Sequence, residues 1–327
     1  MKTVVKLRQK SVGVSFAGGG AKSFAELATL EALQKKDVRI SAVTGTSMGS
    51  FLAAGLAYGL TLEELERLII ETDAALEASE LFKKRPVWLT LLAVNQGIGL
   101  VSSERLAEVV APLHVLYQDV MLSDLPLPIA IPTVDIITGK IIVFTNRKDY
   151  FNRNMADQQW EFYEGDITVL EACLASSAYP LMIQPLMIDD YQLVDGGVLM
   201  NSPVDLFDRT QTEFLVSIGI KRKVYEGPAL KSNEVALRAM NFLMSQQIDR
   251  SIASADVMLQ FELTQSTFSF GQAAEIIAAG RKFMLDHSLD LSQLYEKEIV
   301  ESTIGSTWSD YSNWKDRMKT WLRNASR

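Results

Sequence analysis

A serine at position 47 lies in the pentapeptide GTSMG, residues 45–49, between two apolar stretches. The preceding stretch, 39–43, predicts a strand, and the following one, 50–58, predicts a helix. A G-x-S-x-G pattern in this setting is typical of a nucleophile elbow, a tight turn that exposes a serine hydroxyl at the end of a sheet. Glycine suits the flanking positions because a Cβ there would crowd the neighbouring strand or helix. The sequence therefore predicts that Ser47 is a nucleophile.

Three consecutive glycines, Gly18, Gly19 and Gly20, join a predicted buried strand over 11–17 to a predicted helix over 22–36. Glycines at the start of a helix leave several backbone N–H groups unobstructed, and such groups can hold an anion. The anion could be a phosphate or the oxyanion of a tetrahedral intermediate. A plain tight turn is the third interpretation.

Two nucleotide-binding fingerprints fail at this loop. A phosphate loop that used Lys22 and Ser23 would need glycine at positions 16 and 21, where the chain has Phe16 and Ala21. The dinucleotide fingerprint would need glycine or alanine at position 23, which is serine. The sequence therefore favours an oxyanion loop or a simple turn over a nucleotide site.

A third motif follows a predicted strand over 191–194, where Asp195 is succeeded by two glycines. Such a sequence often forms a plain turn. A helix start is predicted a few residues later, at 201–204, so the carboxylate is expected where a strand ends. Catalytic groups of α/β folds collect at that edge of the sheet, and Asp195 is therefore a candidate catalytic residue.

Taken in order along the chain, these motifs resemble those of the patatin-like phospholipase family in its bacterial form. GGGAK at 18–22 is similar to the family's oxyanion loop with its basic residue, here Lys22. GTSMG resembles the elbow, ASSAYP at 175–180 the small-residue segment before the aspartate, and DGG at 195–197 the Asp-Gly-Gly motif. The resemblance extends from about residue 11 to about residue 220.

The resemblance implies a Ser–Asp dyad. Ser47 would attack an ester carbonyl, Asp195 would take the hydroxyl proton and later activate water, and the amides of Gly18–Gly20 would stabilise the oxyanion. An unperturbed aspartate has a pKa of about 3.9, so burial is expected to raise the pKa of Asp195 and make it a better base. Two positions depart from the family pattern, Ser23 where glycine is frequent and Glu26 where many bacterial members have histidine, and both bear on loop geometry and nearby charge.

Two other functions stay open. A Ser–His–Asp hydrolase would need one of the two histidines, His114 or His287, and the order Ser47, Asp195, His287 is that of the α/β-hydrolases. However, His287 ends a predicted amphipathic helix rather than lying on a loop after the last strand, and only about two predicted strands precede Ser47. The second alternative is a lipid- or acyl-binding protein of the same fold without catalysis.

Composition narrows the class of protein. The chain has 327 residues, of which 48% are apolar, and a net charge of −8, which disfavours nucleic-acid binding. No stretch of about 18 uncharged apolar residues predicts a membrane span, and no apolar stretch of about 7–15 residues near the N-terminus predicts a secretory signal. The single cysteine, Cys173, is consistent with a reducing cytoplasm. We expect a cytoplasmic lipid hydrolase that uses neither a cofactor nor a metal ion, as the resemblance implies.

The predicted strands and helices alternate along the chain, which indicates an α/β fold with a mostly parallel central sheet and helices on both faces. The resemblance implies the patatin-like three-layer form of this fold, over residues 1–290, with a C-terminal helical extension over 291–327. Strands at 128–136 and 140–145 are predicted to form a hairpin. Thr61 and Glu64 form a predicted capping box.

Two segments could contact a membrane peripherally. Residues 81–94 combine a basic cluster with an apolar run, between two predicted helices, where a lid over Ser47 could lie. Residues 314–327 carry five basic side chains against one acidic one, and Trp314, Met318 and Trp321 share one face of a predicted helix. Either segment could instead pack on its own domain.

Overall fold

The computed structural model describes residues 2–82, 101–110, 112, 116–117, 119–152, 160–221, 225, 227–228, 231–251 and 254–302. The chain divides into two compact units. The larger unit spans residues 11–290, and the smaller one combines residues 1–10 with 291–327.

The larger unit is built on a nine-stranded sheet with the strand order β10-β9-β2-β3-β4-β5-β6, to which β8 and β7 are added beside β4. The five strands from β10 to β4 are parallel, and antiparallel pairing begins where β4 meets β5 and β8. This confirms the predicted α/β fold with a mostly parallel sheet. The strands are β2 (Val12–Phe16), β3 (Ile40–Gly45), β4 (Ile129–Asp135), β5 (Ile141–Thr145), β6 (Trp160–Phe162), β7 (Leu186–Ile188), β8 (Tyr191–Asp195), β9 (Phe214–Ile220) and β10 (Val257–Phe261).

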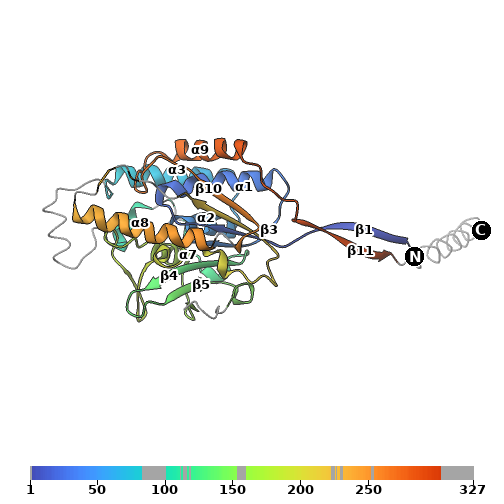
Figure 1. Ribbon diagram of the computed structural model, residues 1–327. Coiled ribbons are helices and arrows are strands. Elements are labelled where there is room, and N and C mark those ends of the chain that lie inside the picture. The colour runs from blue at the N-terminus through green and yellow to red at the C-terminus, as the bar shows by residue number, and fades with distance from the viewer. Residues whose placement is uncertain are drawn as a thin grey trace, which may run out of the picture. The chain divides into compact units, whose positions relative to one another are not determined.

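Helices cover both faces of this sheet (Figure 1). Helices α1, α3 and α9 pack together on one side, while α8 packs against the 3-10 turns η4 and η5 on the other. Among the described residues no helix is both long and apolar enough to cross a membrane. The α-helices are α1 (Leu27–Gln34), α2 (Met48–Tyr58), α3 (Leu62–Ala78), α5 (Ser103–Val109), α7 (Val169–Ser176), α8 (Ser232–Ser251) and α9 (Ala273–Asp286), and the 3-10 turns are η1 (Gly20–Glu26), η2 (Leu122–Asp124), η3 (Lys148–Tyr150), η4 (Gly196–Val198) and η5 (Pro203–Leu206).

Local sequence signals explain several boundaries. Thr61 caps α3, because its side chain accepts a hydrogen bond from the Glu64 amide and the Glu64 carboxylate accepts one from the Thr61 amide, so the predicted capping box is confirmed. The hairpin of β4 and β5 is also confirmed, and Gly139 takes the positive φ of 73° that its turn requires. The helix predicted over 22–36 differs, since its first part is the 3-10 turn η1 and regular α-helix begins only at Leu27.

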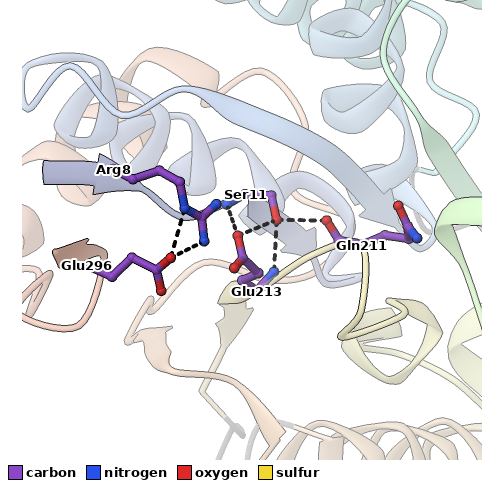
Figure 2. A network of polar contacts seen from close by, with 5 residues as sticks. All are labelled: Arg8, Ser11, Gln211, Glu213 and Glu296. Atoms are coloured by element: carbon purple, nitrogen blue, oxygen red, sulfur yellow. Dashed lines mark hydrogen bonds and ion pairs between the residues drawn. The ribbon is translucent and has the colours of Figure 1, made fainter. Parts of the chain in front are cut away.

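Hydrogen bonds at the start of β2 fix its register against β9 (Figure 2). The Ser11 hydroxyl donates to the Gln211 carbonyl at 2.7 Å and accepts from the Glu213 amide at 3.1 Å. The Ser11 amide donates to the Glu213 carboxylate at 3.0 Å. This anchoring matters for the site because the glycine loop follows directly from the other end of β2.

The smaller unit is an antiparallel pair of strands, β1 (Lys2–Gln9) and β11 (Tyr295–Ser302). Opposite charges face one another across the pair, as in the ion pair of Arg8 with Glu296 (Figure 2), and such cross-strand pairs favour this register. Part of the segment for which a helical extension was expected, 295–302, is therefore a strand. The expected helix over 314–327 lies outside the described residues.

Candidate active site

Ser47 occupies a strained turn between β3 and α2. Its φ of 53° and ψ of −131° are unusual for a residue with a side chain. Gly45 and Gly49 make the turn possible, because a Cβ at Gly45 would lie 2.5 Å from the Gly49 carbonyl oxygen and one at Gly49 would lie 2.7 Å from the Ala17 carbonyl oxygen. The turn predicted from the pentapeptide is thus present, with both glycines in the close contacts expected of them.

A serine from α7 holds this turn in place. The Ser47 amide donates to Ser176 Oγ at 3.0 Å, and Ser176 Oγ donates in turn to the Pro132 carbonyl of β4 at 2.8 Å. All three groups are buried. Ser176 belongs to the small-residue segment singled out in the sequence, and its hydroxyl ties the turn at Ser47 to the neighbouring strand.

Two strands that run toward one another bring Asp195 to Ser47. One edge of β4 pairs with β5. The other edge pairs with β3 around Ile129 and with the antiparallel β8 at Thr133, which faces Asp195. The carboxyl ends of β3 and β8 therefore meet on the same edge of β4. The Ser47 hydroxyl donates a hydrogen bond of 2.7 Å to Asp195 Oδ2. Asp195 was expected at the end of a strand, but it arrives on an antiparallel strand rather than a parallel one.

The surroundings of Asp195 tune its acidity. Its side chain is fully buried, and burial raises the pKa of the carboxyl to about 7, against the opposing effect of hydrogen bonds from the Ser47 hydroxyl and the Gly197 amide. The Gly197 amide donates to Oδ1 at 2.8 Å, which leaves Oδ2 for Ser47. A carboxyl with this pKa can both take up and return a proton near neutral pH.

The glycine loop lies beside Ser47, but its three amides are not equivalent. The Gly18 amide donates to the Asn201 carbonyl at 3.1 Å. The amides of Gly19 and Gly20 have no acceptor among the described residues, and both glycines line the same cavity as Ser47. Gly20 has a φ of 59°, and a Cβ there would lie 2.2 Å from the Thr267 carbonyl oxygen. Two of the three predicted amides are thus available to a ligand.

The neighbours of the loop include the two positions that depart from the family pattern. The Ser23 hydroxyl donates to the Ala17 carbonyl at 3.1 Å and so braces the loop across its base. Glu26 is fully buried, neither of its carboxylate oxygens has a hydrogen-bond partner among the described residues, and burial raises its pKa well above the ordinary value. Lys22, the predicted basic residue, is buried and lines the cavity.

Ser47 and Asp195 line one cavity, which is open to solvent on one side. One part of its wall is polar, because the Tyr179 hydroxyl donates to Asn241 Oδ1 at 3.2 Å and Asn241 Nδ2 donates to the Tyr225 hydroxyl at 3.0 Å. The rest is largely apolar, and its residues come from α2, α3, α5, α7, α8 and the segments that follow α3, α5, α7 and β10: Met48, Phe51, Leu76, Phe82, Leu106, Val110, Leu174, Ile183, Phe242, Met244, Phe268 and Phe270. The wall thus suits a largely hydrocarbon ligand.

Several lining residues were not predicted from the sequence. Asn241 and Met244 come from α8, and Asn201 follows the Asp-Gly-Gly motif, yet no local pattern marks them as part of a site. Of the segment predicted as a lid, Phe82 lines the cavity and stacks on Phe268 with ring centroids 5.5 Å apart. Residues 83–94 lie outside the described residues.

Histidine does not complete a triad with the residues described. His287 is exposed at the end of α9, where its ring stacks on Phe283 at 3.8 Å and its Nδ1 lies 2.9 Å from the Phe283 carbonyl oxygen. It is not among the residues that line the cavity. His114 lies outside the described residues.

The fold and the site define an α/β protein with a buried serine–aspartate pair beside a glycine loop, at the end of a mostly parallel sheet. The model of the family described as Patatin-like phospholipase matches residues 14–208, which is more than half of the chain. The chain belongs to the patatin-like phospholipase family.

Similarity to individual proteins is more distant. The cGAMP-activated phospholipase of Vibrio cholerae is 30% identical over 207 residues, which cover 58% of this chain and 54% of that protein. The uncharacterized protein YqhO of Bacillus subtilis is 25% identical, over 65% of this chain and 72% of its own length. The neuropathy target esterase sws of Drosophila melanogaster is 26% identical, over 65% of this chain but 13% of its own length.

Among solved structures, VipD from Legionella pneumophila has a TM-score of 0.47 and 15% identity, over 90% of this chain and 69% of that one. The chain spans about half the length of the Vibrio cholerae relative and a small part of the Drosophila esterase. Family membership, with these relatives, supports lipid hydrolysis as the class of function.

Proposed function

We propose that this protein hydrolyses a carboxylic ester bond of a phospholipid, lysophospholipid or other lipid, with Ser47 as the nucleophile and Asp195 as the general base. The observation that carries the proposal is the hydrogen bond of 2.7 Å from the Ser47 hydroxyl to a buried carboxyl whose pKa is raised to about 7. A serine hydroxyl is a weak nucleophile until a neighbouring base accepts its proton.

In the acylation step, Ser47 Oγ attacks the ester carbonyl carbon as its proton passes to Asp195 Oδ2. The carbonyl oxygen then carries a negative charge, and the amides of Gly19 and Gly20 are the donors proposed to stabilise it. When the tetrahedral intermediate collapses, the bond to the alcohol oxygen breaks and Asp195 returns the proton to that oxygen. The products of this step are the free alcohol and an acyl ester on Ser47.

In the deacylation step, Asp195 takes a proton from a water molecule that attacks the acyl-enzyme. A second tetrahedral intermediate forms, and its collapse releases the fatty acid and returns the proton to Ser47 Oγ. One carboxyl thus acts as base and acid in turn, which a pKa near neutrality favours.

The cavity wall supports a lipid rather than a polar ester as the substrate. Its apolar residues offer a hydrocarbon chain a long contact surface, and burial of such a chain is favourable by roughly 0.8 kcal/mol for each CH₂ group. The polar set around Asn241 would contact the alcohol portion of the ester. A cytoplasmic location with peripheral membrane contact stays a prediction.

An activity-based label tests the proposal directly. Wild-type protein, Ser47→Ala and Asp195→Asn would each be treated with a fluorophosphonate and separately incubated with mixed lipid vesicles, whose products are identified by mass spectrometry. We expect labelling and fatty-acid release by wild-type protein only, with both variants folded.

Two outcomes would contradict the proposal. Release of fatty acid by pure Ser47→Ala would exclude Ser47 as the nucleophile. Wild-type protein that binds lipid but neither reacts with the label nor releases fatty acid would instead indicate a lipid-binding protein of the same fold.

A further inference from the structure

Helix α8 carries an exposed apolar surface. Among the side chains that the structure describes in this helix, six are exposed, and they follow one another on one side of it: Val235, Ala236, Ala239, Phe242, Leu243 and Gln246. Five of the six are apolar and none is charged. Val235, Phe242 and Leu243 are 52%, 37% and 60% exposed. We call these six residues the α8 stripe.

The two charged side chains described in α8, Glu234 and Arg238, lie on another side of the helix and are partly buried. They pair with each other at 2.5 Å, and the Arg238 guanidinium lies 4.5 Å from the centroid of the Tyr225 ring. Asn241 lies on the same side and bonds to two tyrosines. A surface helix of a globular protein ordinarily turns its charged residues toward water. The arrangement in α8 is therefore unusual for a helix that contacts only water.

The α8 stripe reaches the cavity of Ser47. Phe242 belongs to the stripe and also lines the cavity, together with Asn241 and Met244 of the same helix. Because Phe242 is both exposed and part of the cavity wall, it lies where the cavity meets the surface. An exposed apolar surface of this kind marks a site of contact with a protein or a membrane.

Two exposed lysines adjoin these features. Lys221 lines the cavity, as Phe242 does, and its side chain is 54% exposed where it pairs with Glu262. Lys231 is exposed and precedes Val235 by four residues. An uncharged apolar surface with lysines beside it suits a lipid bilayer, because the apolar side chains can enter the acyl boundary while the ammonium groups stay at the level of the headgroups.

We propose that the α8 stripe is the surface by which this protein docks on a lipid bilayer. The proposal rests on the proposed function for the class of substrate, a lipid that must leave a bilayer to reach Ser47. In the docked protein, α8 lies in the plane of the interface and Phe242 marks the entrance to the cavity. Because the stripe carries no charge, the contact depends on apolar burial and should resist salt.

Two matched double variants test this surface. Val235→Glu/Leu243→Glu places two charges on the stripe, and neither residue lines the cavity. Ile70→Glu/Leu285→Glu is the control, because it changes two exposed apolar residues of α3 and α9, on the other side of the sheet (Figure 1). Each full-length protein would be co-sedimented with phosphatidylcholine vesicles at about 1 M salt, where a screening length of about 3 Å suppresses contacts between exposed charges.

We expect wild-type protein and the control to bind these vesicles equally. Val235→Glu/Leu243→Glu should bind about 10- to 100-fold less, because two apolar side chains no longer enter the bilayer. Its hydrolysis of lipid in vesicles should fall with binding. Its melting temperature and its rate on a soluble nitrophenyl ester, measured alongside, should match those of the control.

A label at position 243 tests the contact without adding charge. Leu243→Cys would carry an environment-sensitive fluorophore, and Leu285→Cys would carry the same label as the control. Cys173 is buried and should stay unlabelled. We expect the emission at position 243, but not at position 285, to increase and shift to shorter wavelength when vesicles are added.

Three outcomes would overturn the proposal: no vesicle binding by wild-type protein, equal binding by the two double variants, or an unchanged signal from the label at position 243. A dimer that forms without lipid and dissociates only in Val235→Glu/Leu243→Glu, with any of these outcomes, would assign the stripe to a second copy of this chain. Failure of the proposed function is distinguishable, because wild-type protein would then bind vesicles through the stripe without Ser47-dependent release of fatty acid.

Discussion

Asp195 is fully buried, which raises its pKa, and accepts two hydrogen bonds, which lower it. The effect of burial is the larger one. A free aspartate would be ionised throughout the neutral range and would be a poor base. At a pKa of about 7 the same group is a stronger base, at the cost of being partly protonated at neutral pH. Both the rate of ester hydrolysis and the stability of the protein should therefore change with pH as this one carboxyl ionises.

The pH dependence of the rate is the first prediction. Because only the ionised carboxyl can accept the Ser47 proton, kcat/KM on a soluble ester should rise with pH through about 7 and then level off. Steady-state kinetics between about pH 5 and about pH 9 would check this. A profile that is already flat above about pH 5 would mean that Asp195 is not raised in pKa or is not the base.

Stability gives the matching prediction, with Asp195→Asn as the variant. The folded pKa lies above the ordinary value, so the contribution of this carboxyl to stability is fully present below its ordinary pKa and is lost as pH rises toward 7. The amide cannot ionise and avoids that loss. Asp195→Asn should therefore have a higher free energy of unfolding than wild-type protein at about pH 8, a smaller advantage at about pH 5, and almost no activity. Thermal unfolding at both pH values would check it, and an equal difference at both would contradict it.

The pH dependence of stability can also be tested at Glu26, which lies away from the reacting atoms. Its pKa is raised by burial alone, and no described residue hydrogen-bonds to its carboxylate. Its stabilising neutral form is therefore favoured at low pH, and stability falls as pH rises above the ordinary pKa of a glutamate. Glu26→Gln should unfold at a higher temperature than wild-type protein, by a margin that grows with pH. Glu63→Gln, on the exposed side of α3, is the control and should show no such growth.

At the scale of elements, the site depends on how α7 and β4 hold the turn after β3. Ser176 Oγ joins the Ser47 amide to the Pro132 carbonyl, and all three are buried. Ser176→Ala would leave both groups unpaired, which typically costs about 1–3 kcal/mol for each buried group. We expect a lower melting temperature and a lower kcat, because Ser47 loses a contact that fixes its strained backbone. Urea unfolding and ester kinetics measure the two effects.

Ser177→Ala is the matched stability control for this prediction. The Ser177 hydroxyl is buried next to Ser176 and has no partner among the described residues, so its removal should not destabilise the fold. If Ser176→Ala were as stable as Ser177→Ala, the bridge from α7 to the turn would contribute little.

The sequence predicted the local turns of the site, but it could not predict how distant strands and helices come together. The turn at Ser47, the glycine loop and the Asp-Gly-Gly turn were predictable because each is a local pattern in which glycine is required by close backbone contacts. The approach of β8 against β4 was not, because strand direction depends on pairing between distant segments. For the same reason no local pattern could show that the Gly18 amide bonds to the Asn201 carbonyl, or that α8 supplies a wall of the cavity.

In the whole chain, ester hydrolysis and membrane binding should depend on different residues. Every described residue that lines the cavity lies between Gly18 and Phe270, within the unit of residues 11–290. A truncated protein of residues 11–290 should therefore keep Ser47-dependent hydrolysis of a soluble ester. A folded truncated protein that lost this activity would show that the β1–β11 unit contributes to the site.

The sequence of residues 314–327 is basic and contains tryptophan, which predicts that its removal lowers membrane binding rather than ester hydrolysis. If this segment docks on lipid, a protein ending at residue 302 should bind anionic vesicles less than the full chain does, while its rate on a soluble ester is unchanged. Binding of the full chain should weaken with salt, because exposed charges are screened over about 8–10 Å at ordinary ionic strength. Co-sedimentation with anionic and neutral vesicles at two salt concentrations would check this. Equal binding by the shortened protein would exclude the tail as the anchor, and a fall in melting temperature would indicate that its apolar face packs on the protein instead.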